Sequence, residues 1–196
     1  MANSEHDNEQ RGDKRMRAIY LMGTKVYLRA MIEADKECGI AWFNSGLPLA
    51  GFGNHYPINA ARAETVLKEE NSGAWGGNRR YAIVRNDGDE VVGSFVEESN
   101  YPIVARVGIH MAPMLADADC LQAEALSLVI PWLRDERQFR LIQIYLPDDQ
   151  RETIAAAATL DMTEVVRLRR HVARPGDRVD LVLYQAVNPR WAGVHA

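Results

Sequence analysis

The feature that most constrains the fold is a strand–helix–strand succession in the second half of the chain. Ala105 to Met111 alternates like a β-strand, Leu121 to Leu133 is a helix rich in alanine and leucine, and Leu141 to Leu146 is a nearly all-apolar strand. A strand of that composition is typical of a position buried on both faces of a sheet. We therefore expect the two strands to be parallel neighbours that splay apart at their C-terminal ends.

The remaining segments indicate antiparallel strands and further helices around this unit. Strands are expected at Lys25–Arg29, Arg80–Arg85, Glu90–Glu97, Val165–Leu168 and Asp180–Ala186, and helices at Ile32–Trp42, Asn59–Glu70 and Thr153–Leu160. Asn86-Asp87-Gly88 is a strong hairpin signal, and Pro131 interrupts the last turn of the central helix. The predicted fold class is α/β (α+β), with a mixed, mostly antiparallel seven-stranded sheet and about four helices on its faces.

Composition limits the domain organisation and the classes of function. A length of 196 residues fits one domain, expected at residues 17–196 after a polar, disordered tail at residues 1–16. The net charge of -4 gives no bulk attraction for nucleic acid. The sequence shows no signal peptide and no apolar run long enough to span a membrane. Cys38 and Cys120 lack metal-ligand spacing, so we expect no metal site and a reduced, cytoplasmic protein.

Several short motifs stand in a characteristic order along the chain. They are Gly23-x-x-Val26-x-Leu28-Arg29 with Asp35 and Trp42, Val91-Val92-Gly93, Glu124-Ala125-Leu126, and finally Asp180, Tyr184 and Trp191. Together they resemble the RimJ/RimL branch of the GCN5-related N-acetyltransferase (GNAT) superfamily over about residues 20 to 191. The resemblance implies a GNAT fold, an acyl-CoA-dependent N-acyltransferase using acetyl-CoA or another acyl-CoA, and an amine of a protein N-terminus or small molecule as acceptor. It also suggests a homodimer.

The resemblance fails at the family's cofactor loop, which precedes Glu124. Its arginine aligns with Asp117, and its glycines align with Ala118, Cys120 and Gln122. Glycines there let backbone N–H groups at the helix start approach the cofactor's pyrophosphate. Asp117 and Asp119 would instead repel phosphate and cap the helix themselves, and the loop carries no positive charge. We therefore expect acetyl-CoA to bind weakly.

Other positions of the resembled cofactor site are altered more mildly. The asparagine and serine of the second cofactor motif align with Gln150 and Thr153, and its Gly-Phe aligns with Asp161-Met162. Glutamine and threonine retain an amide and a hydroxyl. The backbone of the two parallel strands could hold the pantetheine arm of the cofactor, whatever side chains those strands carry. The cofactor-binding residues implied by the resemblance are Met111, Leu121, Gln122, Ala123 and Gln150.

Three residues are candidates for catalysis, each with a structural alternative. His110 suits the acceptance of a proton from an amine that attacks the thioester directly, or is a hydrogen-bonded residue of the sheet. Glu98 is a base or an amine-binding group, or a solvated strand end beside Glu97. Thr153 offers a hydroxyl near the departing thiolate, or caps a helix. Cys120 at a helix start is a weaker nucleophile candidate, because its aspartate neighbours raise a thiol pKa.

Two further groups of side chains leave their roles open. The basic run of Arg167, Arg169, Arg170, His171 and Arg174 is a solvated strand face or binds an acidic partner. The cluster of Trp42, Phe43, Phe52, His55 and Tyr56 shapes the acceptor site, as the resemblance implies, or packs in the core. The altered loop supports an alternative function, in which a non-catalytic or repurposed member binds another ligand or a partner protein in the same cleft.

Overall fold

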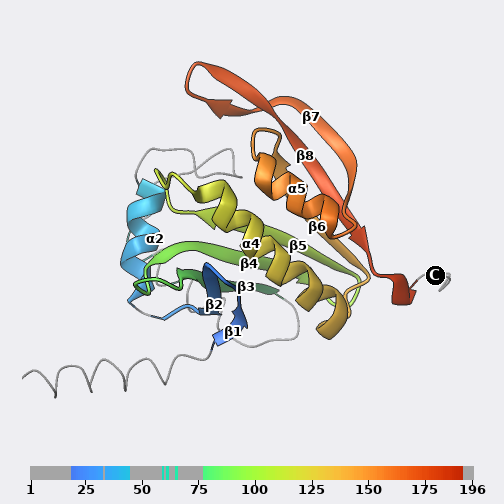
Figure 1. Ribbon diagram of the computed structural model, residues 1–196, viewed down its shortest axis with the longest axis horizontal. Coiled ribbons are helices and arrows are strands. Elements are labelled where there is room, and N and C mark those ends of the chain that lie inside the picture. The colour runs from blue at the N-terminus through green and yellow to red at the C-terminus, as the bar shows by residue number, and fades with distance from the viewer. Residues whose placement is uncertain are drawn as a thin grey trace, which may run out of the picture.

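The computed structural model describes residues 19–32, 34–44, 59, 61, 65 and 77–191. Its strands form an eight-stranded sheet in the order β1-β2-β3-β4-β5-β6-β8-β7 (Figure 1). All neighbours are antiparallel except β5 and β6. The strands are β1 Ile19–Met22, β2 Val26–Ala30, β3 Gly77–Arg85, β4 Val91–Asn100, β5 Val104–Met111, β6 Leu141–Pro147, β7 Thr163–Arg174 and β8 Asp177–Val187.

The predicted parallel pair is confirmed as β5 and β6. Their ladder runs from Val104 opposite Leu141 to Val107 opposite Ile144 and ends there. Residues 108–111 and 145–147 belong to the same two strands but are not paired with each other. The C-terminal halves of the two strands therefore leave an opening between neighbouring strands of the sheet.

Helices α4 (Ala118–Pro131) and α5 (Arg151–Thr159) lie side by side on one face of the sheet (Figure 1). The buried residues of α4 include Leu121, Ala125, Val129 and Ile130, whose helical spacing forms one apolar stripe. On β5, buried and more exposed residues alternate, so Ile109 and Met111 face this stripe while His110 points to the opposite face. This alternation separates the main core from the face that carries His110.

A buried ion pair links β2 to helix α2 (Asp35–Asn44). The Arg29 guanidinium donates two hydrogen bonds to the Asp35 carboxylate, at 2.6 and 2.9 Å, and both side chains are almost fully buried. Asp35 also accepts the N–H of Ile32 at 2.8 Å. Arg29 and Asp35 of the family motif therefore hold β2 and α2 together. The Asp35 carboxylate also fixes the segment between them through its hydrogen bond with Ile32.

The proline in the central helix changes the type of helix rather than ending it. After Pro131, the chain continues as a π-helix from Trp132 to Glu136, closed by the hydrogen bond from the Arg137 N–H to the Trp132 carbonyl at 3.0 Å. Proline lacks an N–H and its ring crowds the preceding turn, and here the wider π-turn follows it directly. Leu133 in this turn is fully buried and extends the core.

The structure corrects the strand count and the extent of the last hairpin. β1 was not expected, and it adds an eighth strand at one edge of the sheet. β7 was expected only at Val165–Leu168, but it runs from Thr163 to Arg174 and projects with β8 beyond the body of the molecule (Figure 1). Most of β7 is exposed, so its sequence lacks the apolar alternation that marks a half-buried strand.

The hairpin also contains an irregularity that its sequence did not signal. The register shifts between Leu168 and Val172, and Arg170 adopts a positive φ of 49°. The Arg178 guanidinium donates to the Arg170 and His171 carbonyls at 2.6 and 2.8 Å, which stabilises this bulge.

Some expected elements lie outside the described residues. These are the tail at residues 1–16, the aromatic residues Phe52, His55 and Tyr56, and the helix at Asn59–Glu70 apart from residues 59, 61 and 65. The described α-helices are α2, α4 and α5. Within this described part of the chain, no helix is both long and apolar enough to cross a membrane.

Candidate functional site

The candidate site lies where the open ends of β5 and β6 meet the start of α4. β5 ends at Met111, and a short loop leads to α4 at Ala118. The unpaired ends of the two strands offer backbone N–H and C=O groups to a ligand. The side chain of Asp117 does not cap the N-terminus of α4, and the Ala118 N–H donates to the Leu115 carbonyl at 3.4 Å. A helix N-terminus of this kind attracts anions through its dipole.

The expected self-capping of α4 by Asp117 is wrong. The Asp117 carboxylate instead pairs with both terminal nitrogens of Arg85 on β3, at 2.8 and 3.1 Å. The Arg85 guanidinium lowers the pKa of Asp117 by this hydrogen bonding, so the carboxylate stays ionised and its charge is balanced. The repulsion of a phosphate by Asp117 is therefore smaller than its sequence position suggests.

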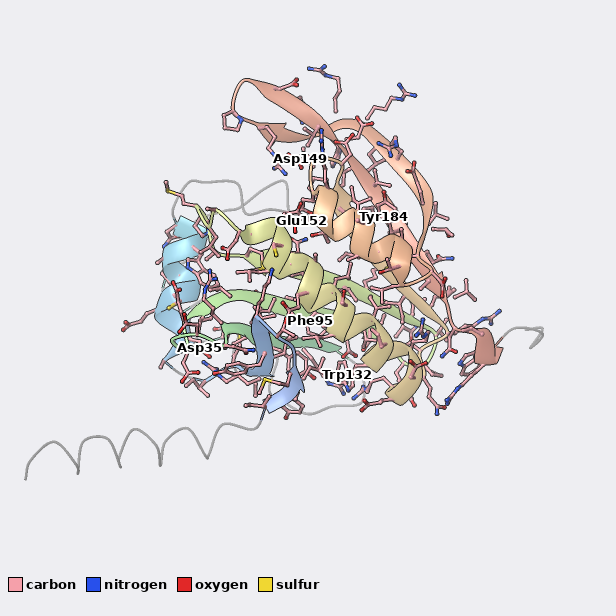
Figure 2. All side chains as sticks on the ribbon, viewed as in Figure 1. Asp35, Phe95, Trp132, Asp149, Glu152 and Tyr184 are labelled. Atoms are coloured by element: carbon pink, nitrogen blue, oxygen red, sulfur yellow. The ribbon has the colours of Figure 1, made fainter. Side chains whose placement is uncertain are left out.

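Asp119 serves the neighbouring helix. Its carboxylate accepts the N–H groups of Glu152 and Thr153 at 2.8 and 3.0 Å and the Thr153 hydroxyl at 2.6 Å. Asp119 thus caps the first turn of α5 from the first turn of α4. Figure 2 shows Glu152 at this end of α5. The Thr153 side chain is fully buried, and its hydroxyl is occupied with Asp119.

Gln122 and Gln150 also face each other rather than the solvent. Their amides exchange two hydrogen bonds, at 3.1 and 3.0 Å, and both side chains are buried. Gln122 comes from α4 and Gln150 immediately precedes α5, so the pair joins the two helices. Of the other expected cofactor residues, Met111 and Leu121 are buried and Ala123 is half-buried.

A lysine reaches the start of α4 from the turn between β1 and β2. The Lys25 ammonium lies 2.7 Å from the Cys120 sulfur, and this contact raises the pKa of Lys25. Together with Arg85, Lys25 brings positive charge to a loop whose own sequence has none. Sequence reasoning missed both cations, because they come from distant segments of the chain.

The catalytic candidates stand apart from one another. His110 on β5 is half-buried and lies opposite Ser94 of β4. Glu98 is exposed near the end of β4, four positions beyond Ser94, which corresponds to roughly 13 Å along a strand. Its neighbour Glu97 points to the α4 side, is fully buried, and lies 3.5 Å from Arg79. The structure therefore forms no dyad from His110 and Glu98.

Two glycines of the family motifs permit close packing around this site. A Cβ at Gly23 would lie 2.4 Å from Glu124 Oε1, and a Cβ at Gly93 would lie 2.6 Å from the His110 carbonyl oxygen. Glu124 accepts the Lys25 N–H at 2.8 Å and the Thr24 hydroxyl at 3.0 Å. These motif residues therefore fix the turn beside α4 and the approach of β4 to β5.

Within the described part of the chain, no group of three or more histidine, cysteine, aspartate or glutamate side chains is arranged to hold a metal ion. The side chains that meet at the candidate site are instead two cations, their carboxylate and thiol partners, and a buried amide pair. With an open strand edge and a helix N-terminus beside them, these groups fit a ligand that carries both amide and phosphate groups.

The fold is similar to that of solved acetyltransferases. A Sphaerobacter thermophilus protein classed as an acetyltransferase is 41% identical, with 88% of this chain and 99% of that chain covered and a TM-score of 0.71. A Bacillus anthracis acetyltransferase of the GNAT family is 11% identical, with 87% and 99% covered and a TM-score of 0.63. No protein-family model and no curated protein matches the sequence.

A third similar structure contains coenzyme A. It is RimL, the ribosomal L7/L12 α-N-protein acetyltransferase, bonded to coenzyme A by a cysteine disulfide; it is 15% identical, with 87% of this chain and 98% of that chain covered and a TM-score of 0.64. The fold, the unpaired ends of β5 and β6, and the 41% identity to the Sphaerobacter protein all indicate an acetyltransferase. The chain belongs to the same acetyltransferase family as the Sphaerobacter protein, and its fold is that of the GNAT acetyltransferases.

Proposed function

We propose that this protein is an acyl-CoA-dependent N-acyltransferase that transfers an acetyl group to a primary amine of a protein N-terminus or a small molecule. The observation that carries the proposal is the end of the β5–β6 ladder at Val107 and Ile144, after which β5 continues unpaired with β6 and leads through a short loop to the N-terminus of α4. The opening suits an extended amide-containing arm, and the helix start suits a pyrophosphate.

Acetyl-CoA would supply the activated acetyl group, and the residues of the chain would bind and orient it. The backbone of residues 108–111 would hold the pantetheine arm, and the N–H groups of the first turn of α4 would face the pyrophosphate. Lys25 and Arg85 would add positive potential there. The Gln122–Gln150 pair would contribute by fixing α4 against the start of α5. The residues that would shape this site are Met111, Leu121, Gln122, Ala123 and Gln150.

His110 is the proposed proton acceptor. It stands on the last part of β5, beyond the end of the paired ladder, and its imidazole titrates near neutral pH when unperturbed. Glu98 is proposed to attract the acceptor amine from the exposed end of β4. Thr153 is proposed to act on the thiolate side of the site, through the cap that it shares with Asp119.

The binding of acetyl-CoA is proposed to remain weak, with a dissociation constant above roughly 100 μM against the micromolar scale of a working site. Asp119, Glu124 and Glu152 surround the start of α4 with negative charge, and Cys120 places a side chain where the family has glycine. Calorimetry at low salt tests this value. Low-micromolar binding would show that the strand backbone carries the affinity.

Activity is tested by the release of coenzyme A from acetyl-CoA with two panels of acceptors, peptides with free N-termini and small polyamines. We expect transfer by the parent protein, and a decrease of about a hundredfold in kcat for His110→Ala, the scale of one general base. Thr153→Ala should cost less, and Cys38→Ser, a half-exposed position on α2, is the control. Equal rates for parent and His110→Ala from about pH 6 to about pH 9 would remove His110 from the mechanism.

The alternative is a non-catalytic member that uses the same cleft for another ligand or partner protein. Hydrogen bonds within the chain favour this alternative, because they engage side chains at the cofactor-loop positions that would otherwise face a ligand. These side chains are Asp117, Asp119, Gln122 and Gln150. Absence of both transfer and acetyl-CoA binding, in a protein with cooperative unfolding, would support this alternative.

A further inference from the structure

A lysine–cysteine pair at the start of α4 is placed for covalent chemistry. Lys25 Nζ and Cys120 Sγ lie 2.7 Å apart, closer than an ordinary N–H···S contact. Lys25 is exposed in the turn between β1 and β2, and Cys120 is half-exposed in the first turn of α4. Solvent and small oxidants can therefore reach the two groups.

The backbone of Lys25 is held in place by the same helix that carries Cys120. Glu124 stands one turn after Cys120, so the two side chains share one face of α4. The Glu124 carboxylate accepts the N–H groups of Thr24 and Lys25. The close approach is possible because residue 23 is glycine, where a Cβ would collide with Glu124. A bond between Lys25 and Cys120 would therefore require no rearrangement of the chain.

Cys120 lies in the first turn of α4, partly exposed, and contacts the ammonium of Lys25. A partly exposed position beside a cationic group is typical of reactive cysteines. The two nearest aspartates along the chain are engaged elsewhere, Asp117 with Arg85 and Asp119 with the first turn of α5. The thiolate is the form that reacts with peroxides.

We propose that Lys25 and Cys120 form a covalent cross-link when the protein meets a hydroperoxide. The Cys120 sulfur attacks one peroxide oxygen; the O–O bond breaks and an S–O bond forms. The other oxygen takes up a proton from solvent and leaves as water from hydrogen peroxide, or as an alcohol from an organic hydroperoxide, so sulfur is oxidised and the peroxide is reduced. Lys25, after losing a proton to solvent, attacks the sulfur of this sulfenic acid; an N–S bond forms, the S–O bond breaks, and a water molecule leaves. The contact between the two atoms favours this step over further oxidation.

The consequence for the cofactor rests on the proposed function, whereas the cross-link itself does not. The cross-link removes the positive charge of Lys25 and fixes a bulky bridge at the N-terminus of α4, where the pyrophosphate is proposed to bind. We expect the oxidised protein to bind acetyl-CoA at least about fivefold more weakly than the reduced protein. Acetyl-CoA in excess should slow the formation of the link.

The test is mass spectrometry of the full chain after hydrogen peroxide treatment, alkylation of remaining thiols and proteolysis. We expect a peptide pair that joins Lys25 to Cys120, with the mass of the two peptides less two hydrogens, which dithiothreitol separates. Cys38→Ser should retain the link. Lys25→Arg keeps the positive charge but removes the nucleophilic amine, so it should give no link and more sulfinic acid at Cys120.

Equal conversion of Cys120 to sulfinic acid in the parent and in Lys25→Arg, with no joined peptides, would overturn the proposal. A disulfide between Cys120 and Cys38 as the main product would overturn it as well. Calorimetry on reduced and oxidised protein separates the two hypotheses. If the cross-link forms and the affinity for acetyl-CoA does not change, the effect on the cofactor is refuted. If the reduced protein does not bind acetyl-CoA, the proposed function is refuted, and the peptide map still decides whether the cross-link forms.

Discussion

The Arg85–Asp117 ion pair gives a quantitative prediction for cofactor binding. Replacing Arg85 with alanine leaves the Asp117 carboxylate uncompensated at the start of α4. A carboxylate about 5 Å from a phosphate repels it by about 3 kcal/mol at an effective dielectric of about 20. The Asp117 side chain is 44% exposed, so solvent screens most of this energy, and about 1 kcal/mol remains. We therefore expect Arg85→Ala to raise the dissociation constant for acetyl-CoA about fivefold.

The assay is calorimetry at low salt with a double-mutant cycle. Asp117→Asn alone should tighten binding, because it frees Arg85 for the phosphate, and the double variant should return close to the parent value. Arg190→Ala, an exposed change of equal charge in η2 (Pro189–Trp191), is the control. A change smaller than about twofold in Arg85→Ala, with the control unchanged, would refute the placement of the cofactor phosphates at this end of α4.

Three other predictions concern stability. Gln122→Leu should lower the free energy of unfolding in urea by about 1–3 kcal/mol, because it leaves the buried Gln150 amide without its partner. Adding Gln150→Leu should recover part of this loss, and equal stability of the single and double variants would count against the pair. Asp35→Ala should cost about 3–5 kcal/mol in the same assay, because Arg29 remains as a buried charge, and a loss below about 1 kcal/mol would contradict a buried tie. The pKa of Asp117 is lowered in the folded state, so its contribution to stability is present above its unfolded pKa of about 4 and is lost as the pH falls through the lower, folded value. The stability difference between the parent and Asp117→Asn should therefore shrink in acid, and a difference that grows there would reverse the sign of our argument.

The sequence predicted the elements whose signals are local. The apolar run at Leu141–Leu146 identified a strand, and the strand–helix–strand order then implied a parallel pair. The expected burial on both faces is wrong, because Ile142, Ile144 and Leu146 are buried while Tyr145 on the other face is 43% exposed. Asn86-Asp87-Gly88 placed the turn between β3 and β4, where Gly88 has a φ of 84°. Each of these inferences depends on a composition that few other structures tolerate.

The partners of charged residues could not be predicted, because they depend on contacts between distant segments. Asp117 was expected to repel a phosphate, but its charge is balanced by a residue 32 positions earlier. Asp119 was expected at the start of its own helix and instead caps the next one. A sequence shows the charges of a loop, whereas the electrostatics of a site depends on what the fold brings beside it.

The family motifs were recognisable while their physical roles were not. Glu124 and Gly23 belong to separate motifs of the resembled family, but in the structure they are in contact. Glu124 accepts the Lys25 N–H in the turn between β1 and β2, and it can approach that turn because Gly23 has no Cβ. Arg29 and Asp35 form a buried ion pair. These motifs therefore specify the fold, and resemblance in them alone does not establish a working cofactor loop.

The account is tested most directly by a crystal structure of the protein grown with coenzyme A at millimolar concentration, about tenfold above the lower bound proposed for the dissociation constant of acetyl-CoA. We predict electron density for the pantetheine arm between residues 108–111 of β5 and the end of β6, with the pyrophosphate at the first turn of α4 beside Arg85 and Lys25. Coenzyme A bound elsewhere on the chain, or another ligand in this opening while coenzyme A is absent from it, would contradict the proposed acyltransferase site.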